Sequence, residues 1–168
     1  VPPPPAPPVT GAFFSEKLAE MDAAVRHAIE DKRLPGGVLW LERNRDTYSR
    51  AYGNRALVPV RESMTSDTIF DAASLTKVIA TAPAILLLIE RGKIQLDAPV
   101  HTYLPEFKAN AKESITIRHL LTHTSGLRPG LSALPPWSSY ARGIELACAE
   151  KPASPPGTGF RYSDINYI

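Results

Sequence analysis

The sequence predicts a mixed α and β protein, in which an antiparallel sheet flanked by helices is joined to a mostly helical part. Three observations predict this class. Apolar residues recur at helical spacing from about Ser15 to Asp31. Two short β-type runs then flank a turn at residues 44–46. Finally, the apolar run Val78 to Ile89 is shorter than the roughly twenty residues that span a bilayer. It therefore predicts a buried core helix and no transmembrane segment.

The first residues form a proline-rich tether, assigned to residues 1–14. Prolines dominate residues 1–9, which predicts a stiff polyproline II linker outside any packed core. Residue 1 is not methionine, which suggests a processed or engineered start, as when a secretory signal has been removed. We therefore expect an exported protein that is periplasmic, secreted or tethered to the envelope.

After the tether, Ser15 is expected to cap a helix that runs to about Asp31. Its predicted buried stripe consists of Leu18, Met21, Val25, Ala28 and Ile29. Pro35-Gly36-Gly37 ends this segment. Strands at 38–41 and around 47–52 then predict an antiparallel hairpin. Residues 15–70 would thus supply the helix and first strands of the α/β part.

Residues 71–168 predict the mostly helical part. A helix is expected from Ser74 to about Arg91, with Gly92 as its stop and Pro83 bending or breaking it. Thr116 is expected to cap a short helix, and residues 140–149 a further one. The chain ends in an apolar run at 166–168. That ending resembles the middle of an element, so we expect a truncated or cleaved polypeptide.

Composition excludes several classes of function. Hydrophobic residues make up 43% of the chain and charged residues 21%, which is typical of a globular domain. The net charge of +2 is too small to indicate a nucleic-acid partner. Cys148 is the only cysteine, so no internal disulfide can form. No cofactor is implied.

The segment Ser74-Leu75-Thr76-Lys77 carries the clearest chemical signal. On a helix, residues three apart are neighbours, so Ser74 and Lys77 would share one face. A serine hydroxyl becomes a good nucleophile when a nearby base, such as a lysine of lowered pKa, takes its proton. The alternative interpretation is a helix-capping serine beside a solvated lysine.

Several ordered segments together resemble the serine β-lactamase and DD-peptidase superfamily, particularly its class C β-lactamase and esterase branch. Residues Phe70–Lys77 are similar to the family's nucleophile motif. Tyr162-Ser163-Asp164 is similar to the family's second motif, Tyr-x-Asn. The other similar segments are 87–105 and 117–127. The resemblance implies a β-lactamase/DD-peptidase-like fold, with residues 15–168 as the N-terminal portion of the hydrolase domain and the C-terminal strands missing.

The resemblance also implies roles for four residues. Ser74 would be the acylated nucleophile, Lys77 and Tyr162 the proton-transfer pair, and Asp164 a substrate-binding residue. Which member of the Lys77–Tyr162 pair carries the proton stays open. Asp164 replaces the commoner asparagine, so it gains a negative charge that would support Lys77 and disfavour anionic substrate groups. The expected substrates are small-molecule esters, amides or β-lactams.

The family's third motif, a Lys-Thr-Gly-like or His-x-Gly-like strand, is absent from this sequence. In the family that strand supplies one backbone N–H of the oxyanion hole, and losing such a donor costs about 100- to 1,000-fold in rate. We therefore expect residues 1–168 to be inactive alone and to need the C-terminal remainder of the same protein as a partner.

The sequence also allows an inactive domain, a zinc site and two interpretations of the loop 128–140. A catalytically inactive binding or scaffold domain would use the same fold, although retention of Ser74, Lys77 and Tyr162 favours an enzyme. His119 and His123 have the spacing of zinc ligands, but position 120 is not the glutamate that the zinc-protease motif requires, so no metal is expected. The loop 128–140, with Trp137 and Tyr140, is either an apolar acyl pocket or ordinary aromatic packing.

Overall fold

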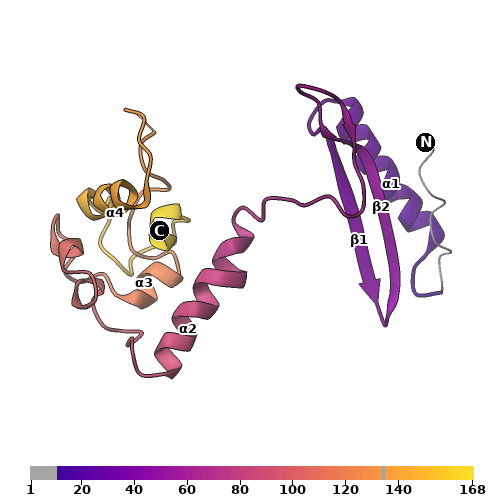
Figure 1. Ribbon diagram of the computed structural model, residues 1–168. Helices are drawn as coiled ribbons and strands as arrows, with labels where there is room; N and C mark the ends of the chain where they lie inside the picture. The colour runs from indigo at the N-terminus through magenta and orange to yellow at the C-terminus, as the bar shows by residue number, and fades with distance from the viewer. Residues whose placement is uncertain (1–10, 134) are drawn as a thin grey trace. The chain divides into compact units, whose positions relative to one another are not determined.

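The computed structural model describes residues 11–133 and 135–168, so the proline-rich stretch 1–10 lies outside the described residues. The chain divides into two compact units, Val1–Asp71 and Ala72–Ile168. The first unit contains one helix and three strands, and the second contains the remaining helices (Figure 1).

The first unit is the predicted helix and hairpin with one further strand. Helix α1 spans Ser15–Glu30, and strands β1 (Gly36–Arg43) and β2 (Asp46–Ala56) pair antiparallel along their length. Asn44 and Arg45 both have positive φ, 52° and 73°, as a tight two-residue turn between twisted strands requires. The hairpin prediction is confirmed, with longer strands than expected. Strand β3 (Glu62–Ser63), which pairs with β2, was not predicted.

A buried carboxylate joins α1 to β2. Asp22 accepts hydrogen bonds from the hydroxyls of Tyr48 (2.6 Å) and Tyr52, and pairs with Arg50 at 2.7 Å. Burial acts against the charge of Asp22, but these partners hold the pKa of its carboxyl below the usual value. The predicted stripe was therefore wrong at Met21, which is 37% exposed while Asp22 is buried.

The predicted cap at Ser15 was also wrong. Phe14 occupies the N-cap position, and its side chain makes no capping hydrogen bond. Ser15 is the first helical residue instead, one position further into the helix than the sequence suggested. The error shifts the helix start by one residue and leaves the predicted length of the helix almost unchanged.

The helix predicted from Ser74 to Arg91 is divided into segments. A π-helical turn spans Lys77–Thr81, and α2 follows over Ala82–Glu90. The N–H of Ala82 bonds to the carbonyl of Lys77, five residues back. Pro83 has no N–H to donate to the preceding turn, so a change in the hydrogen-bond pattern here is expected. The local break predicted at Pro83 is found.

The second unit by itself buries little of the apolar run 78–89. Val78, Ile79 and Leu86 are each more than half exposed. Only Ile85 of this run packs against the apolar core of the second unit. The burial of the rest of this run stays a prediction.

The second unit has its own core under short helices. These are η2 (Val100–Thr102), η3 (Pro105–Lys108), α3 (Ile117–Leu121), α4 (Tyr140–Ala149) and η4 (Asp164–Tyr167). Thr116 caps α3 as predicted, accepting from the N–H of His119 at 3.3 Å. The buried core residues are Val100, Phe107, Ile115, Ile117, Leu127, Ala147, Cys148 and Ile165.

Lys112 is fully buried beside this core. Its ammonium donates at 2.7 Å to three backbone carbonyls, those of Ala109, Cys148 and Glu150. These bonds tie the segment before Ile115 to the end of α4. Burial lowers the pKa of Lys112 below its usual value, while the three carbonyls satisfy all the donors of the ammonium.

Candidate active site

Ser74 lies at the start of the helical segment, directly after a residue in a left-handed conformation. Ala73 has φ 44°, a region that alanine rarely adopts. The N–H groups of Leu75, Thr76 and Lys77 then bond three residues back, in tight turns. Ser74 was predicted inside the helix and instead precedes it. Its exposed hydroxyl therefore stands at the positive end of the segment, where negative charge is favoured.

Lys77 is the centre of the candidate site. Its Nζ donates to Asp164 Oδ1 over 2.6 Å and to Ser74 Oγ over 3.3 Å. It also lies 5.2 Å from the ring centroid of Tyr162. The side chain of Lys77 is 13% exposed, whereas that of Asp164 is 61% exposed. The ion pair therefore has one shielded and one solvated partner.

The segment that carries Tyr162 and Asp164 is held by two hydrogen bonds to backbone carbonyls of the loop that begins at residue 128. Ser163 Oγ donates to the carbonyl of Arg128 at 2.6 Å, and the N–H of Asp164 donates to that of Pro129 at 2.7 Å. Ser163 is fully buried. The structure thus brings all four predicted residues together, although Ser74 and Tyr162 are 88 positions apart in the chain.

The contacts in the site shift the pKa values of Lys77 and Tyr162 in opposite directions. The hydrogen bond to Asp164 raises the pKa of Lys77 above its usual value, so the amine is held as ammonium. Hydrogen bonds with Ser74 and then Lys77 lower the pKa of the Tyr162 phenol. Of the two groups, Tyr162 is therefore better suited to accept a proton from Ser74.

The two histidines with zinc-like spacing make separate contacts. His119 Nδ1 accepts from the N–H of Thr116 at the start of α3, whereas the His123 ring stacks on Tyr162. Across residues 11–133 and 135–168, no group of three potential metal ligands is found. The contact of His123 with Tyr162 was missed from sequence, because spacing drew attention only to metal binding.

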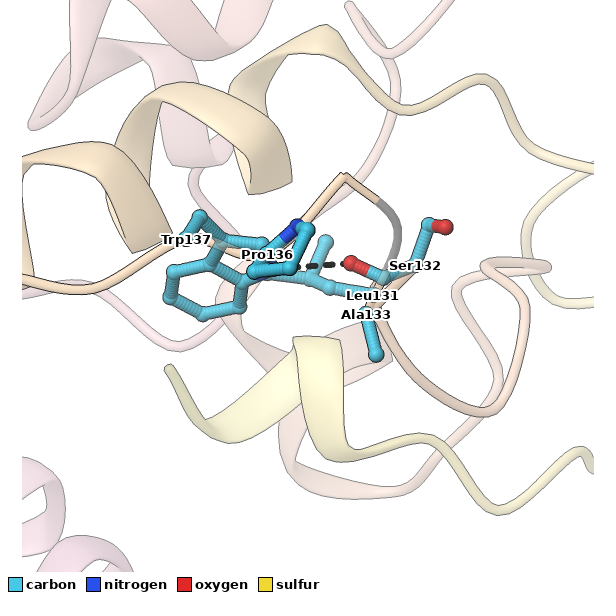
Figure 2. A pocket seen from close by; sticks show the side chains of 5 residues that line it. All are labelled: Leu131, Ser132, Ala133, Pro136 and Trp137. Atoms are coloured by element: carbon cyan, nitrogen blue, oxygen red, sulfur yellow. Dashed lines mark hydrogen bonds between the residues drawn. The ribbon is translucent and has the colours of Figure 1, made fainter.

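A small open pocket lies in the loop after Pro129. It has a volume of about 310 Å³, and its lining residues are Leu131, Ser132, Ala133, Pro136 and Trp137. Figure 2 shows the Trp137 indole beside Pro136 and its N–H pointing to the carbonyl of Ser132, a 2.7 Å hydrogen bond. Trp137 thus lines a pocket, whereas Tyr140 is exposed and is not among the lining residues. An acyl-binding role for this loop stays a prediction.

Ser74, Lys77 and Tyr162 thus lie together at a helix start, an arrangement that serine acyl-transfer chemistry can use. The family described as Beta-lactamase matches residues 21–168 of this sequence, and the chain belongs to that family. This agrees with the resemblance stated from its motifs.

Relatives with different activities share the family. The chain is 38% identical to Esterase EstB of Burkholderia gladioli, over 86% of this chain and 42% of the esterase. It is 35% identical to Acyltransferase mokF of Monascus pilosus, over 67% of this chain and 32% of the acyltransferase. A crystal structure of a class C β-lactamase matches with TM-score 0.72 and 26% identity, over 94% of this chain and 43% of that one.

The chain therefore spans less than half the length of these proteins. The β-lactamase-like fold class, with mixed helices and a small antiparallel sheet, is confirmed. None of the helices in the described residues is long and apolar enough to cross a membrane.

Proposed function

We propose that the protein is a serine hydrolase that acts on small-molecule esters through an acyl-enzyme on Ser74. The observation that carries this proposal is the contact of Lys77 Nζ with both Ser74 Oγ and Asp164 Oδ1. This contact explains why Lys77 stays charged as an ammonium beside Tyr162, whose phenol has a lowered pKa. Tyr162 can then be the base for Ser74, and the Lys77 ammonium is the counter-ion of the phenolate.

The reaction would proceed in two balanced steps. In the first, Tyr162 as phenolate takes the proton of Ser74 while Oγ attacks the carbonyl carbon of the ester. Tyr162 then returns this proton to the leaving alkoxide, and acyl-Ser74 remains. In the second step, a water molecule gives its proton to Tyr162 and attacks the acyl carbon. Tyr162 then returns this proton to Ser74 Oγ as the ester bond breaks, which frees Ser74 and the acid and restores the phenolate.

The charge distribution favours neutral acyl donors. The carboxylate of Asp164 is 61% exposed, so it meets an entering substrate, and an anionic group beside it would be repelled. β-Lactams and peptides with a free carboxylate are therefore expected to be poorer substrates than neutral esters. The similarity to Esterase EstB of Burkholderia gladioli supports the same choice.

The whole protein's activity is expected to need more than residues 1–168. The motif that would supply the second oxyanion donor is not found in this sequence. A C-terminal remainder of the same polypeptide would supply this donor. An exported location, periplasmic, secreted or envelope-tethered, stays a proposal.

The test is covalent labelling of the complete protein that carries this chain. A fluorophosphonate and a penicillin are each added, and the adduct is located by mass spectrometry. We expect the fluorophosphonate on Ser74 and its loss in Ser74→Ala, with Ser114→Ala as the matched control because Ser114 is another exposed serine of the same unit. If neither reagent modifies Ser74, the chain is a binding or scaffold domain instead.

A second measurement tests the dependence on the remainder. Residues 1–168 alone and the complete protein are mixed with a chromogenic ester, and the acylation burst is recorded. We expect the burst of the short chain to be slower by about 100-fold or more. Equal rates would show that the short chain already contains a working oxyanion hole.

A further inference from the structure

His123 contacts the Tyr162 segment through both its ring and its backbone. Its ring centroid lies 4.5 Å from that of Tyr162 at an interplanar angle of 33°, and 5.1 Å from that of Tyr167. Its carbonyl accepts from the N–H of Arg161 at 2.8 Å. His123 itself has φ 56°, a conformation in which histidine is enriched relative to most residues. The bend at His123 thus places its ring on the phenol.

The hydrogen bonds of the His123 ring define its protonation state. Nδ1 lies 3.2 Å from the N–H of Ser163 and 3.1 Å from Nδ2 of Asn166. Oδ1 of Asn166 accepts from the buried hydroxyl of Ser125 at 2.6 Å, which leaves Nδ2 facing the ring of His123. Both neighbours of Nδ1 are therefore donors, so Nδ1 is an acceptor and the proton resides on Nε2.

We propose that neutral His123 is a positioning residue for Tyr162, and that its protonation releases the Tyr162 segment and lowers acylation in acid. This inference rests on the proposed function. A proton on Nδ1 would face the N–H of Ser163 and the amide of Asn166, so both hydrogen bonds would be lost. The phenol would then lose the backbone and ring contacts that keep it against Ser74 and Lys77.

On balance, burial and the charges around His123 lower the pKa of its ring and so favour the neutral form. Burial first, and then the ammonium of Lys77 from the π-helical turn, lower the pKa of His123. The carboxylate of Asp164 from η4 opposes them. The other groups that face the ring are the phenols of Tyr162 and Tyr167. The ring of His123 is thus neutral at physiological pH, and its protonation takes place at more acidic pH.

The kinetic test compares the slopes of pH–rate profiles for acylation in the complete protein. Loss of the Tyr162 phenolate alone gives a slope of one in log rate against pH. Protonation of His123 adds a second proton below its ordinary pKa of about 6.5, so the wild-type slope should approach two. His123→Asn keeps an acceptor and tolerates the positive φ, and its slope should stay at one. An unchanged slope of two in this variant would overturn the proposal.

A second variant and a matched control separate positioning from folding. His123→Phe keeps a ring but leaves the N–H of Ser163 without its acceptor, so we expect an acylation rate about tenfold below that of His123→Asn at pH 8. His119→Asn changes another histidine whose Nδ1 accepts a backbone N–H, and it should keep the wild-type slope. A slope of one in the His119 variant would also contradict the proposal.

A spectroscopic measurement decides the inference even if no acylation is found. Imidazole ¹⁵N shifts should show His123 as the Nε2–H tautomer, and the ¹³Cζ shift of Tyr162 should move as His123 titrates. If these shifts are seen without any Ser74 adduct, the proposed function is wrong, but the coupling between His123 and Tyr162 is supported. An Nδ1–H tautomer, or a Tyr162 signal that ignores the titration, would sink the inference.

Discussion

Lys77 and Asp164, which are 87 residues apart in the chain, form a 2.6 Å ion pair at the centre of the candidate site. The sequence resemblance assigned Asp164 to substrate binding. It also led us to expect that the charge of Asp164 supports Lys77, and the structure gives the carboxylate a direct contact with the lysine, which in turn contacts Ser74 Oγ. The position where the related motif has asparagine thus helps to set the charge of Lys77.

Asp164→Asn should lower the pKa of Lys77, because the bond to Asp164 is the largest cause of its rise. It should also remove the repulsion of anionic substrates. Since Asp164 is mostly solvated, the change in barrier is about 1 kcal/mol, or roughly fivefold in kcat/KM for an anionic β-lactam relative to a neutral ester. Steady-state kinetics with both substrates measures it. Asp97→Asn, which removes an exposed partner of Arg118, is the control and should leave the ratio unchanged.

Tyr162→Phe should reduce acylation by about 100- to 10,000-fold, because it removes the proposed base. The ring contact with His123 would remain, and Tyr162 is 44% exposed, so the free energy of unfolding should change by less than about 0.5 kcal/mol. Stopped-flow acylation and urea denaturation give the two quantities. Tyr103→Phe, which removes a phenol that bonds the N–H of Gln95, should keep full activity. A Tyr162 variant that acylates within threefold of wild type would contradict the assignment.

The pH profile of acylation should be broad on its alkaline side. Activity requires Tyr162 as phenolate, so it should rise through the lowered pKa of Tyr162, below the usual phenol value of about 10. It requires Lys77 as ammonium, so it should fall only above the usual lysine value of about 10.4, because the pKa of Lys77 is raised. Burst rates of a neutral ester between pH 6 and 11 check both limbs. A fall that begins below pH 10 would mean that Lys77 is not held as ammonium.

Asp22→Asn should destabilise the first unit by about 2–3 kcal/mol, because it leaves Arg50 without its buried partner. The pKa of Asp22 is lowered by folding. Its stabilising effect is therefore present above the unfolded value of about 3.9 and is lost as pH falls through the folded value. Urea denaturation followed through Trp40, in a Trp137→Phe background, measures it. Asp31→Asn, at an exposed ion pair with Arg33, should cost under about 0.5 kcal/mol.

Much of the fold could be predicted because local chemistry decides it. The turn at Asn44 and Arg45 follows from residues that tolerate positive φ, and the cap at Thr116 from a hydroxyl one position before an apolar run. Each of these depends on neighbours within a few positions. The hairpin, α3 and α4 were therefore found from sequence alone, whereas the 3-10 helices η2, η3 and η4 were not predicted.

The predictions failed where distant partners decide the outcome. Asp22 is buried because Tyr48, Arg50 and Tyr52 lie on a strand more than 25 residues away, and a single charged residue on a helix gives no sign of this. Lys112 is buried for the same reason, since two of its three acceptors come from the end of α4. The ring contact of His123 with Tyr162 also joins segments that no local pattern relates.

The π-helical turn has a consequence for how the sequence of this helix is aligned and redesigned. Each residue advances an α-helix by about 100°, and the bond from Ala82 back to Lys77 takes in one residue more than an α turn. Positions after Thr81 are thus out of phase with Ser74 and Lys77 by about one residue. Deleting one residue between Val78 and Ala80 would restore regular phase, and either Lys77 or the apolar face of α2 would then be rotated away from its present direction. The nucleophile motif and the apolar face can vary independently only while that extra residue is kept.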